Sequence, residues 1–125
     1  MPFNTELFDL ALGRVRDNVD KVTFCTQLPT TYAEALTTYA LAEKDNPTVT
    51  DIEADGADGR QVRVTTFANG VLLGGGTVTH YALLDTGNSK LEVAEALAAP
   101  VAVNDDNPAN AFEITQDIIV RIAQP

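Results

Sequence analysis

Four carboxylates gather in one short segment of the chain, at Asp51, Glu53, Asp55 and Asp58. Acidic residues at alternate positions followed by a glycine are typical of the first half of a calcium loop, because carboxylate oxygens suit a hard cation. The second half of that pattern is missing, since Val62 stands where the bidentate glutamate would be needed. We therefore predict no metal site and interpret the segment as a solvated turn between two strands, with calcium binding as the alternative.

The chain has one cysteine, Cys25, and one histidine, His80. Cys25 lies in a strand-like run with no histidine nearby in sequence, which is typical of a buried and inert thiol. His80 stands between Val78 and Ala82 on a predicted strand, so we expect it to share their face and to pack there with its ring hydrogen-bonded. A Cys–His pair would need the fold to bring the two side chains together, and the sequence shows no orienting acid. We predict no catalytic residue, no cofactor and no enzyme activity.

Charge restricts the partners of this protein. Its 125 residues include 18 acidic and 8 basic side chains, a formal net charge of −10. Such a surface repels nucleic acid and anionic membranes, so neither is expected as a partner. No apolar run has the length that spans a bilayer, and the acidic residues near the N-terminus do not fit a signal peptide. The sequence therefore predicts a single domain over residues 1–125 that is synthesised in a reducing cytoplasm.

The N-terminal segment, residues 1–20, carries apolar side chains at helical spacing. The stripe that we draw through it comprises Phe3, Leu7, Leu10, Ala11, Val15 and Val19. A stripe of this kind usually packs against the core of its own chain, and a partner surface is the alternative. A second, short helix is predicted over residues 31–38, because Thr31 and Glu34 have the spacing of a capping box.

The rest of the chain, residues 21–125, has the pattern of a β-rich body. Alternating apolar and polar residues predict strands that include residues 21–27, 61–65, 77–84 and 118–122. Asn69-Gly70 predicts a hairpin turn, residues 85–88 a second turn and residues 43–47 a loop, whereas residues 91–97 suit a strand or a helical turn. The pattern favours a mainly β (α+β) fold. We expect an antiparallel β-sandwich or partly open barrel with an N-terminal helix and one short second helix.

Five segments form a recognisable pattern along nearly the whole chain. They are Pro-Thr-Thr-Tyr-x-Glu-Ala at residues 29–35, Tyr-x-Leu-Ala at 39–42, Asp-Gly-Arg-x-Val-x-Val at 58–64, Thr-His-x-Ala-Leu-x-Asp-Thr-Gly at 79–87, and an isoleucine-rich close at 118–125. This pattern resembles that of a family of small virion proteins of tailed bacteriophages, which includes capsid decoration (cement) proteins. The motifs mark structural elements and are not catalytic signatures, and no functional residue of the family is carried over to this chain.

The resemblance implies a structural protein that binds the outer surface of the major capsid shell and stabilises it. Its partners would be the major capsid protein and neighbouring copies of itself, so it would be homo-oligomeric or present in many copies on the virion exterior, after synthesis in the host cytoplasm. The apolar ends of the chain supply the contact candidates Phe3, Leu7, Phe8, Ile119 and Arg121. Two alternatives stay open: a head–tail connector or tail structural protein, and a calcium-dependent surface-binding module that uses residues 51–59.

Overall fold

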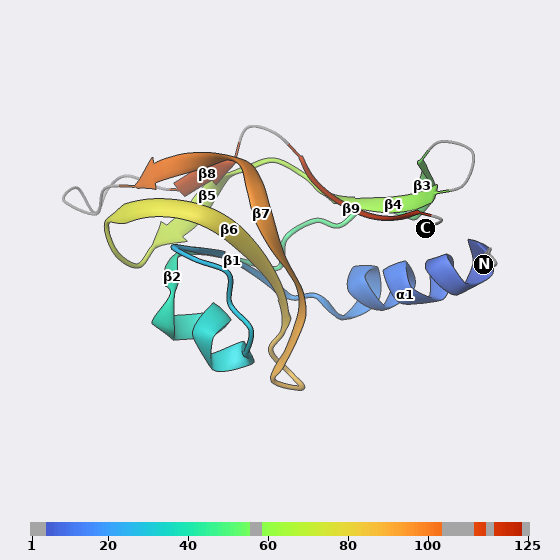
Figure 1. The fold of residues 1–125 in the computed structure, drawn as a ribbon, viewed down its shortest axis with the longest axis horizontal. Coiled ribbons are helices and arrows are strands. Elements are labelled where there is room, and N and C mark those ends of the chain that lie inside the picture. The colour runs from blue at the N-terminus through green and yellow to red at the C-terminus, as the bar shows by residue number, and fades with distance from the viewer. Residues whose placement is uncertain (1–4, 56–58, 104–111, 115–116, 124–125) are drawn as a thin grey trace.

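Two antiparallel sheets and two helices make up the described part of the chain (Figure 1). The computed structural model describes residues 5–55, 59–103, 112–114 and 117–123. In chain order the elements are α1 (Thr5–Asn18), β1 (Lys21–Cys25), the π-helical turn η1 (Glu34–Thr38), β2 (Ala40–Asp45), β3 (Glu53–Asp55), β4 (Gly59–Val64), β5 (Phe67–Leu72), β6 (Gly76–Asp85), β7 (Lys90–Val103), β8 (Phe112–Ile114) and β9 (Ile118–Ala123). The predicted mainly β fold, with an N-terminal helix and a short second helix, is confirmed.

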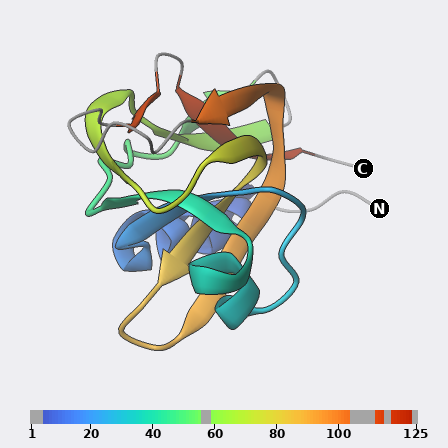
Figure 2. The same cartoon turned by 90° about the vertical axis from the view of Figure 1, so that its left-hand side faces the viewer.

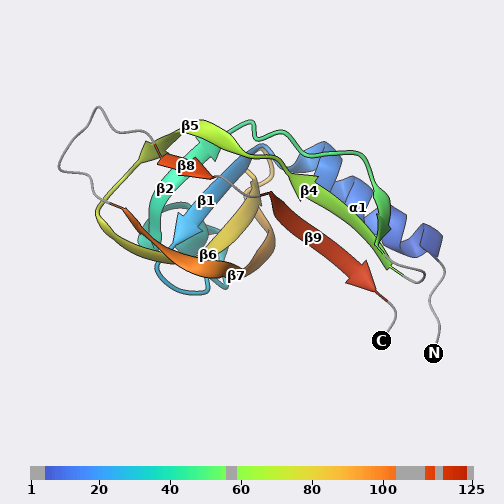
Figure 3. The same cartoon turned by 90° about the horizontal axis from the view of Figure 1, so that it is seen from above.

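The larger sheet has the strand order β7-β6-β1-β2-β5-β8 and the smaller has the order β3-β4-β9. Neither sheet closes into a barrel. The helix α1 lies along one face of the smaller sheet, and the two together extend to one side of the larger sheet (Figures 1 and 3). We call α1, β3, β4 and β9 the arm, and the larger sheet with η1 the body. Viewed from the end of the body, the larger sheet is strongly curved (Figure 2).

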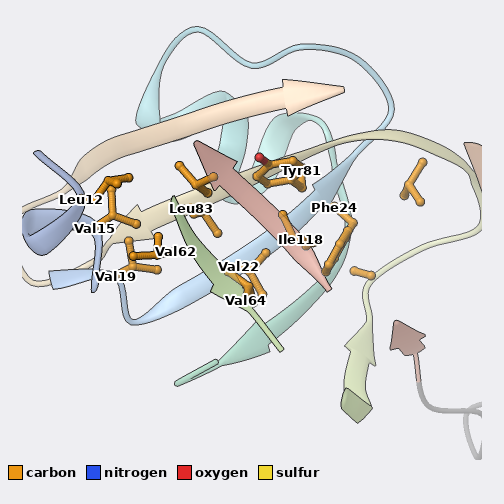
Figure 4. Close-up of a cluster of buried hydrophobic side chains, with 13 residues drawn as sticks. Leu12, Val15, Val19, Val22, Phe24, Val62, Val64, Tyr81, Leu83 and Ile118 are labelled. Carbon is orange, nitrogen blue, oxygen red and sulfur yellow. The ribbon is translucent and has the colours of Figure 1, made fainter. Parts of the chain in front are cut away.

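One hydrophobic cluster joins the arm to the body (Figure 4). Its fully buried side chains include Leu12 of α1, Val62 of β4, and Val22 and Phe24 of β1. The Phe24 ring also meets Phe67 of β5, with ring centroids 6.0 Å apart. Because the same cluster covers both sheets, the arm is held to the body by apolar packing and not only by the chain connections.

The helix α1 buries a different face from the stripe that we drew through the sequence. Its buried side chains are Phe8, Leu12 and Val15, and Val19, just beyond the helix end at Asn18, is buried on the same side. Leu7 and Leu10 are 54% and 74% exposed, so their assignment to the core stripe is wrong. The sequence holds two overlapping apolar faces. Steps of four, three and four residues bring the buried set to one side of the helix, and that side lies on the smaller sheet.

Two local predictions in the larger sheet are also wrong. Residues 43–47 do not form a loop throughout, because β2 continues to Asp45 and pairs with both β1 and β5. Asn69-Gly70 lies inside β5, where the register with β8 shifts between Phe67 and Gly70, and so does not form a hairpin turn. Strand pairing overrides the local turn preference, since Gly70 pairs with Phe112 and the extra β5 residue lies between Phe67 and Gly70.

Other local signals are confirmed. The strand predicted over residues 77–84 lies within β6, and a tight turn leads from Asp85 into β7. One half of the predicted capping box forms at the second helix, where the Glu34 backbone N–H donates to Thr31 Oγ1 at 3.2 Å. The Glu34 carboxylate reaches back to the Thr30 backbone N–H at 3.0 Å. Turn and cap chemistry is local, so the sequence alone specifies it.

Candidate functional site

Cys25 and His80, far apart in sequence, lie opposite each other on the paired strands β1 and β6. The Cys25 side chain is fully buried and its Sγ lies 3.8 Å from the Ala35 carbonyl oxygen of η1. Burial raises the pKa of the Cys25 thiol, which keeps the sulfur protonated at neutral pH. The predicted burial of Cys25 is confirmed. A protonated, covered thiol is a poor nucleophile even with an imidazole beside it.

The His80 ring is fixed by its neighbour on β6. The Thr79 hydroxyl donates to the Thr26 carbonyl at 2.9 Å and lies 2.8 Å from His80 Nδ1. Since that hydroxyl has one proton and gives it to Thr26, its oxygen accepts from His80 Nδ1. The register of β6 with β7 shifts between Val78 and His80. Val78 therefore faces the main core cluster, whereas His80 lies on the same face of β6 as Ala82, which belongs to the second cluster. The expectation that His80 shares a face with Val78 is therefore wrong.

The acidic segment does not bring its carboxylates together as calcium ligands among the described residues. The Asp51 side chain is 97% exposed, and its nearest cation is Arg16, at 3.7 Å. Glu53, on β3, accepts a hydrogen bond from Gln61 Nε2 at 2.8 Å. Asp58 lies outside the described residues, and no group of three or more possible metal ligands occurs within residues 5–55, 59–103, 112–114 and 117–123.

The outer face of the smaller sheet, which points away from α1, is a charged network around Arg63. Arg63 Nη1 donates to Asp117 Oδ2 at 3.1 Å. Arg63 Nε lies 2.8 Å from Glu53 Oε1 as an ion pair, although its N–H is not directed at that oxygen. The hydrogen bond from Gln61, and then Arg63, lower the pKa of Glu53. Asp117 also caps the Thr66 backbone N–H at 3.2 Å, so the network fixes the start of β9 against β4.

The opposite side of the arm is the outward face of α1. Two ion pairs orient the helix: Asp9 with Arg60 of β4 at 2.8 Å, and Arg14 with Glu92 of β7 at 2.9 Å. Glu92 has no residue opposite it on β6, because Leu84 pairs with Leu91 and Leu83 pairs with Val93. These contacts and the buried face leave Leu7 and Leu10 pointing to solvent.

The structure separates the contact residues that we predicted from sequence. Phe3 lies outside the described residues, and Phe8 is 4% exposed, so its side chain offers a partner almost no surface. Leu7 lies on the outward face of α1. Ile119 and Arg121 are exposed on the outer face of the smaller sheet, on the other side of the arm. The described candidates that are exposed therefore lie on two different surfaces of the arm.

Sequence reasoning left Leu10 out of that set, although it is the most exposed of the large apolar side chains described. Apolar spacing alone could not find it, because the same spacing fits a buried residue. The sequence does indicate that some apolar residues must be exposed, because α1 has two apolar faces and only one of them can lie on the sheet.

No family model, no curated protein and no solved structure matches this chain. None of the described helices is long and apolar enough to cross a membrane.

Proposed function

We propose that this protein is a capsid decoration protein of a tailed bacteriophage, which binds the outer surface of the major capsid shell and stabilises it. The sequence pattern over residues 29–125 supports this role through its resemblance to small virion proteins. The observation that carries the proposal is the outward face of α1. Leu7 and Leu10 are largely exposed on this face. The opposite face of α1 is apolar and already packs on the smaller sheet, so these two leucines do not hold the helix in place.

An exposed apolar pair on a firmly held helix is suited to protein contact. The inner face of α1 is buried, and the ion pairs of Asp9 and Arg14 fix its orientation at two points. Little side-chain or backbone freedom of the helix is then lost on binding, which favours affinity for a small surface. Burying a leucine side chain fully contributes about 1.5 to 3 kcal/mol. Repetition of a modest contact over many capsid sites would hold the shell together.

The copy number of the protein in purified virions tests the proposal directly. A decoration protein on the shell should occur in proportion to the major capsid protein, which quantitative mass spectrometry measures. A count that corresponds to a single ring would contradict decoration and support the head–tail connector or tail alternative. Absence from the particle would contradict both.

Binding to undecorated capsids tests the surface. The Leu7→Lys/Leu10→Lys double variant should co-sediment with capsids much less than the wild type, because two ammonium groups would have to be desolvated at the contact. Leu28→Lys is the matched control, since Leu28 lies outside the arm, between β1 and η1, and is 49% exposed. Equal loss with both variants would show that charge in general, and not the α1 face, governs binding.

The calcium-dependent binding module makes a different prediction. It requires a melting temperature that falls on addition of a chelator and rises with added calcium, by the linkage between ligand binding and stability. Glu53 is already engaged by Gln61 and Arg63, so we expect the melting temperature to be unchanged by either addition.

A further inference from the structure

The strand β9 is an open edge of the smaller sheet, and it differs from the other described edges. β9 pairs with β4 without a register shift, from Ile118 to Ala123. No described strand pairs with its other side, and it lies at the margin of the arm (Figure 3). Its six residues contain no proline, glycine or lysine.

The remaining edges of the two sheets are protected in ways that edge strands commonly are. β3 and β8 have three residues each. β7 is long, but its register with β6 shifts twice, and Pro100 lies within the second irregular stretch. Short length, bulges and proline all discourage pairing with another chain. β9 has none of these features, so it is the described edge best suited to add a strand.

We infer that β9 pairs antiparallel with β9 of a second copy of this chain, about a twofold axis at Ile119. The choice of occupant and register follows from charge complementarity. With the axis at Ile119, Asp117 of one copy lies opposite Arg121 of the other, and the symmetric pair repeats the contact. Ile119, 37% exposed in the single chain, meets its own copy between the two ion pairs.

Two other registers are less favourable. A shift of one residue would turn the buried Ile118 and Val120 of one copy toward the charged face of the other. With the axis at Arg121, the two guanidinium groups would lie opposite each other, which is destabilising. The Ile119 register also continues the sheet across the axis as β3-β4-β9-β9-β4-β3, with both α1 helices on one face.

The inference does not rest on the proposed function, because β9 and the outward face of α1 are on different sides of the arm. Sedimentation equilibrium of the purified chain tests it, from about 1 μM to about 1 mM, the range of weak to moderate affinities. We expect the mass to rise with concentration from 13.3 kDa toward twice that value. Ile119→Lys should stay monomeric, because two ammonium groups would meet at the axis. Leu10→Lys is the matched control and should behave as the wild type.

Cysteine cross-linking tests the register. In an antiparallel pair, opposite β-carbons lie about 5 Å apart, close enough for a disulfide after a small adjustment. Ile119→Cys should therefore form a covalent dimer under mild oxidation. In Arg121→Cys the two sulfurs would be separated by about 13 Å along the strands, and no cross-link should form. A wild type that is monomeric throughout, an Ile119→Lys variant that still dimerises, or preferential cross-linking at position 121 would each overturn the inference.

Discussion

Truncation of two leucines on the same helix gives a direct test of how α1 packs. Leu12 is 1% exposed and belongs to the cluster that joins arm and body, whereas Leu10 is 74% exposed. Both lie inside α1, so Leu12→Ala and Leu10→Ala make the same chemical change in the same secondary structure. Intrinsic helix propensity therefore cancels between them, and the difference measures packing alone.

The structure sets the size of that difference. Removing a buried leucine side chain costs about 3 to 4 kcal/mol, because the lost burial and the remaining cavity add together. Removing an exposed one should change the free energy of unfolding by less than about 0.5 kcal/mol. For a chain of 125 residues the unfolding entropy is about 0.26 kcal/mol per kelvin. Leu12→Ala should then lower the melting temperature by about 11 to 15 °C, and Leu10→Ala by about 2 °C or less.

Urea denaturation followed by circular dichroism measures both variants, and calorimetry gives the melting temperatures. Equal slopes against urea would show that the extent of unfolding is unchanged, so that midpoints report stability. Comparable losses for the two variants would refute the packing of α1 described above and would support the stripe through Leu7, Leu10 and Ala11. A larger loss at Leu10 than at Leu12 would refute it more strongly.

Three further predictions concern single groups. Gly13→Ala should stabilise the protein by about 1 kcal/mol in urea denaturation, because a β-carbon there would meet Arg16 and Ile52 only at 3.8 and 3.9 Å; a loss of stability would show that the site is tighter than described. Cys25 should not react with a thiol reagent in the native protein and should react fully in denaturant, since it is covered and its pKa is raised; fast native labelling would contradict this. Burial acts to raise the pKa of Asp20, but hydrogen bonds from the Thr86 hydroxyl and backbone N–H lower it overall. The stability that Asp20 supplies should therefore be complete above the ordinary aspartate pKa and be lost as the pH falls through the lower, folded value. Asp20→Asn should be less stable than the wild type at pH 7 and approach it at low pH; a constant difference across that range would refute the linkage.

Local chemistry in the sequence predicted several elements correctly. The bond from the Glu34 backbone N–H to the Thr31 hydroxyl, the turn after Asp85, and the inward-facing positions of Val62 and Val64 all depend on neighbouring residues, and all three are present in the structure. Elements whose formation depends on distant strands were missed. β2 exists because β1 and β5 supply hydrogen-bond partners on both sides, and no local signal around residues 43–47 records those partners.

The candidate sites show the same division. Sequence identified Ile119 and Arg121 as apolar-end residues, but it could not tell that they lie on the far side of the sheet from Leu7. It also could not show that Cys25 and His80 are opposite each other, because residues 25 and 80 meet only through the β1–β6 register. A shift of one position in that register would have separated them.

The sequence by itself determined the class of this protein: a mainly β, acidic chain with an N-terminal helix, without a recognisable catalytic constellation. Composition, alternation and turn residues set these properties because each acts over a few neighbouring positions. Only the tertiary structure decided which leucines of α1 are buried, where the bulges turn His80 and Glu92, and which strand edge is left open. Those outcomes depend on which surfaces meet, and a helix with two apolar faces or a sheet with several edges does not specify that locally.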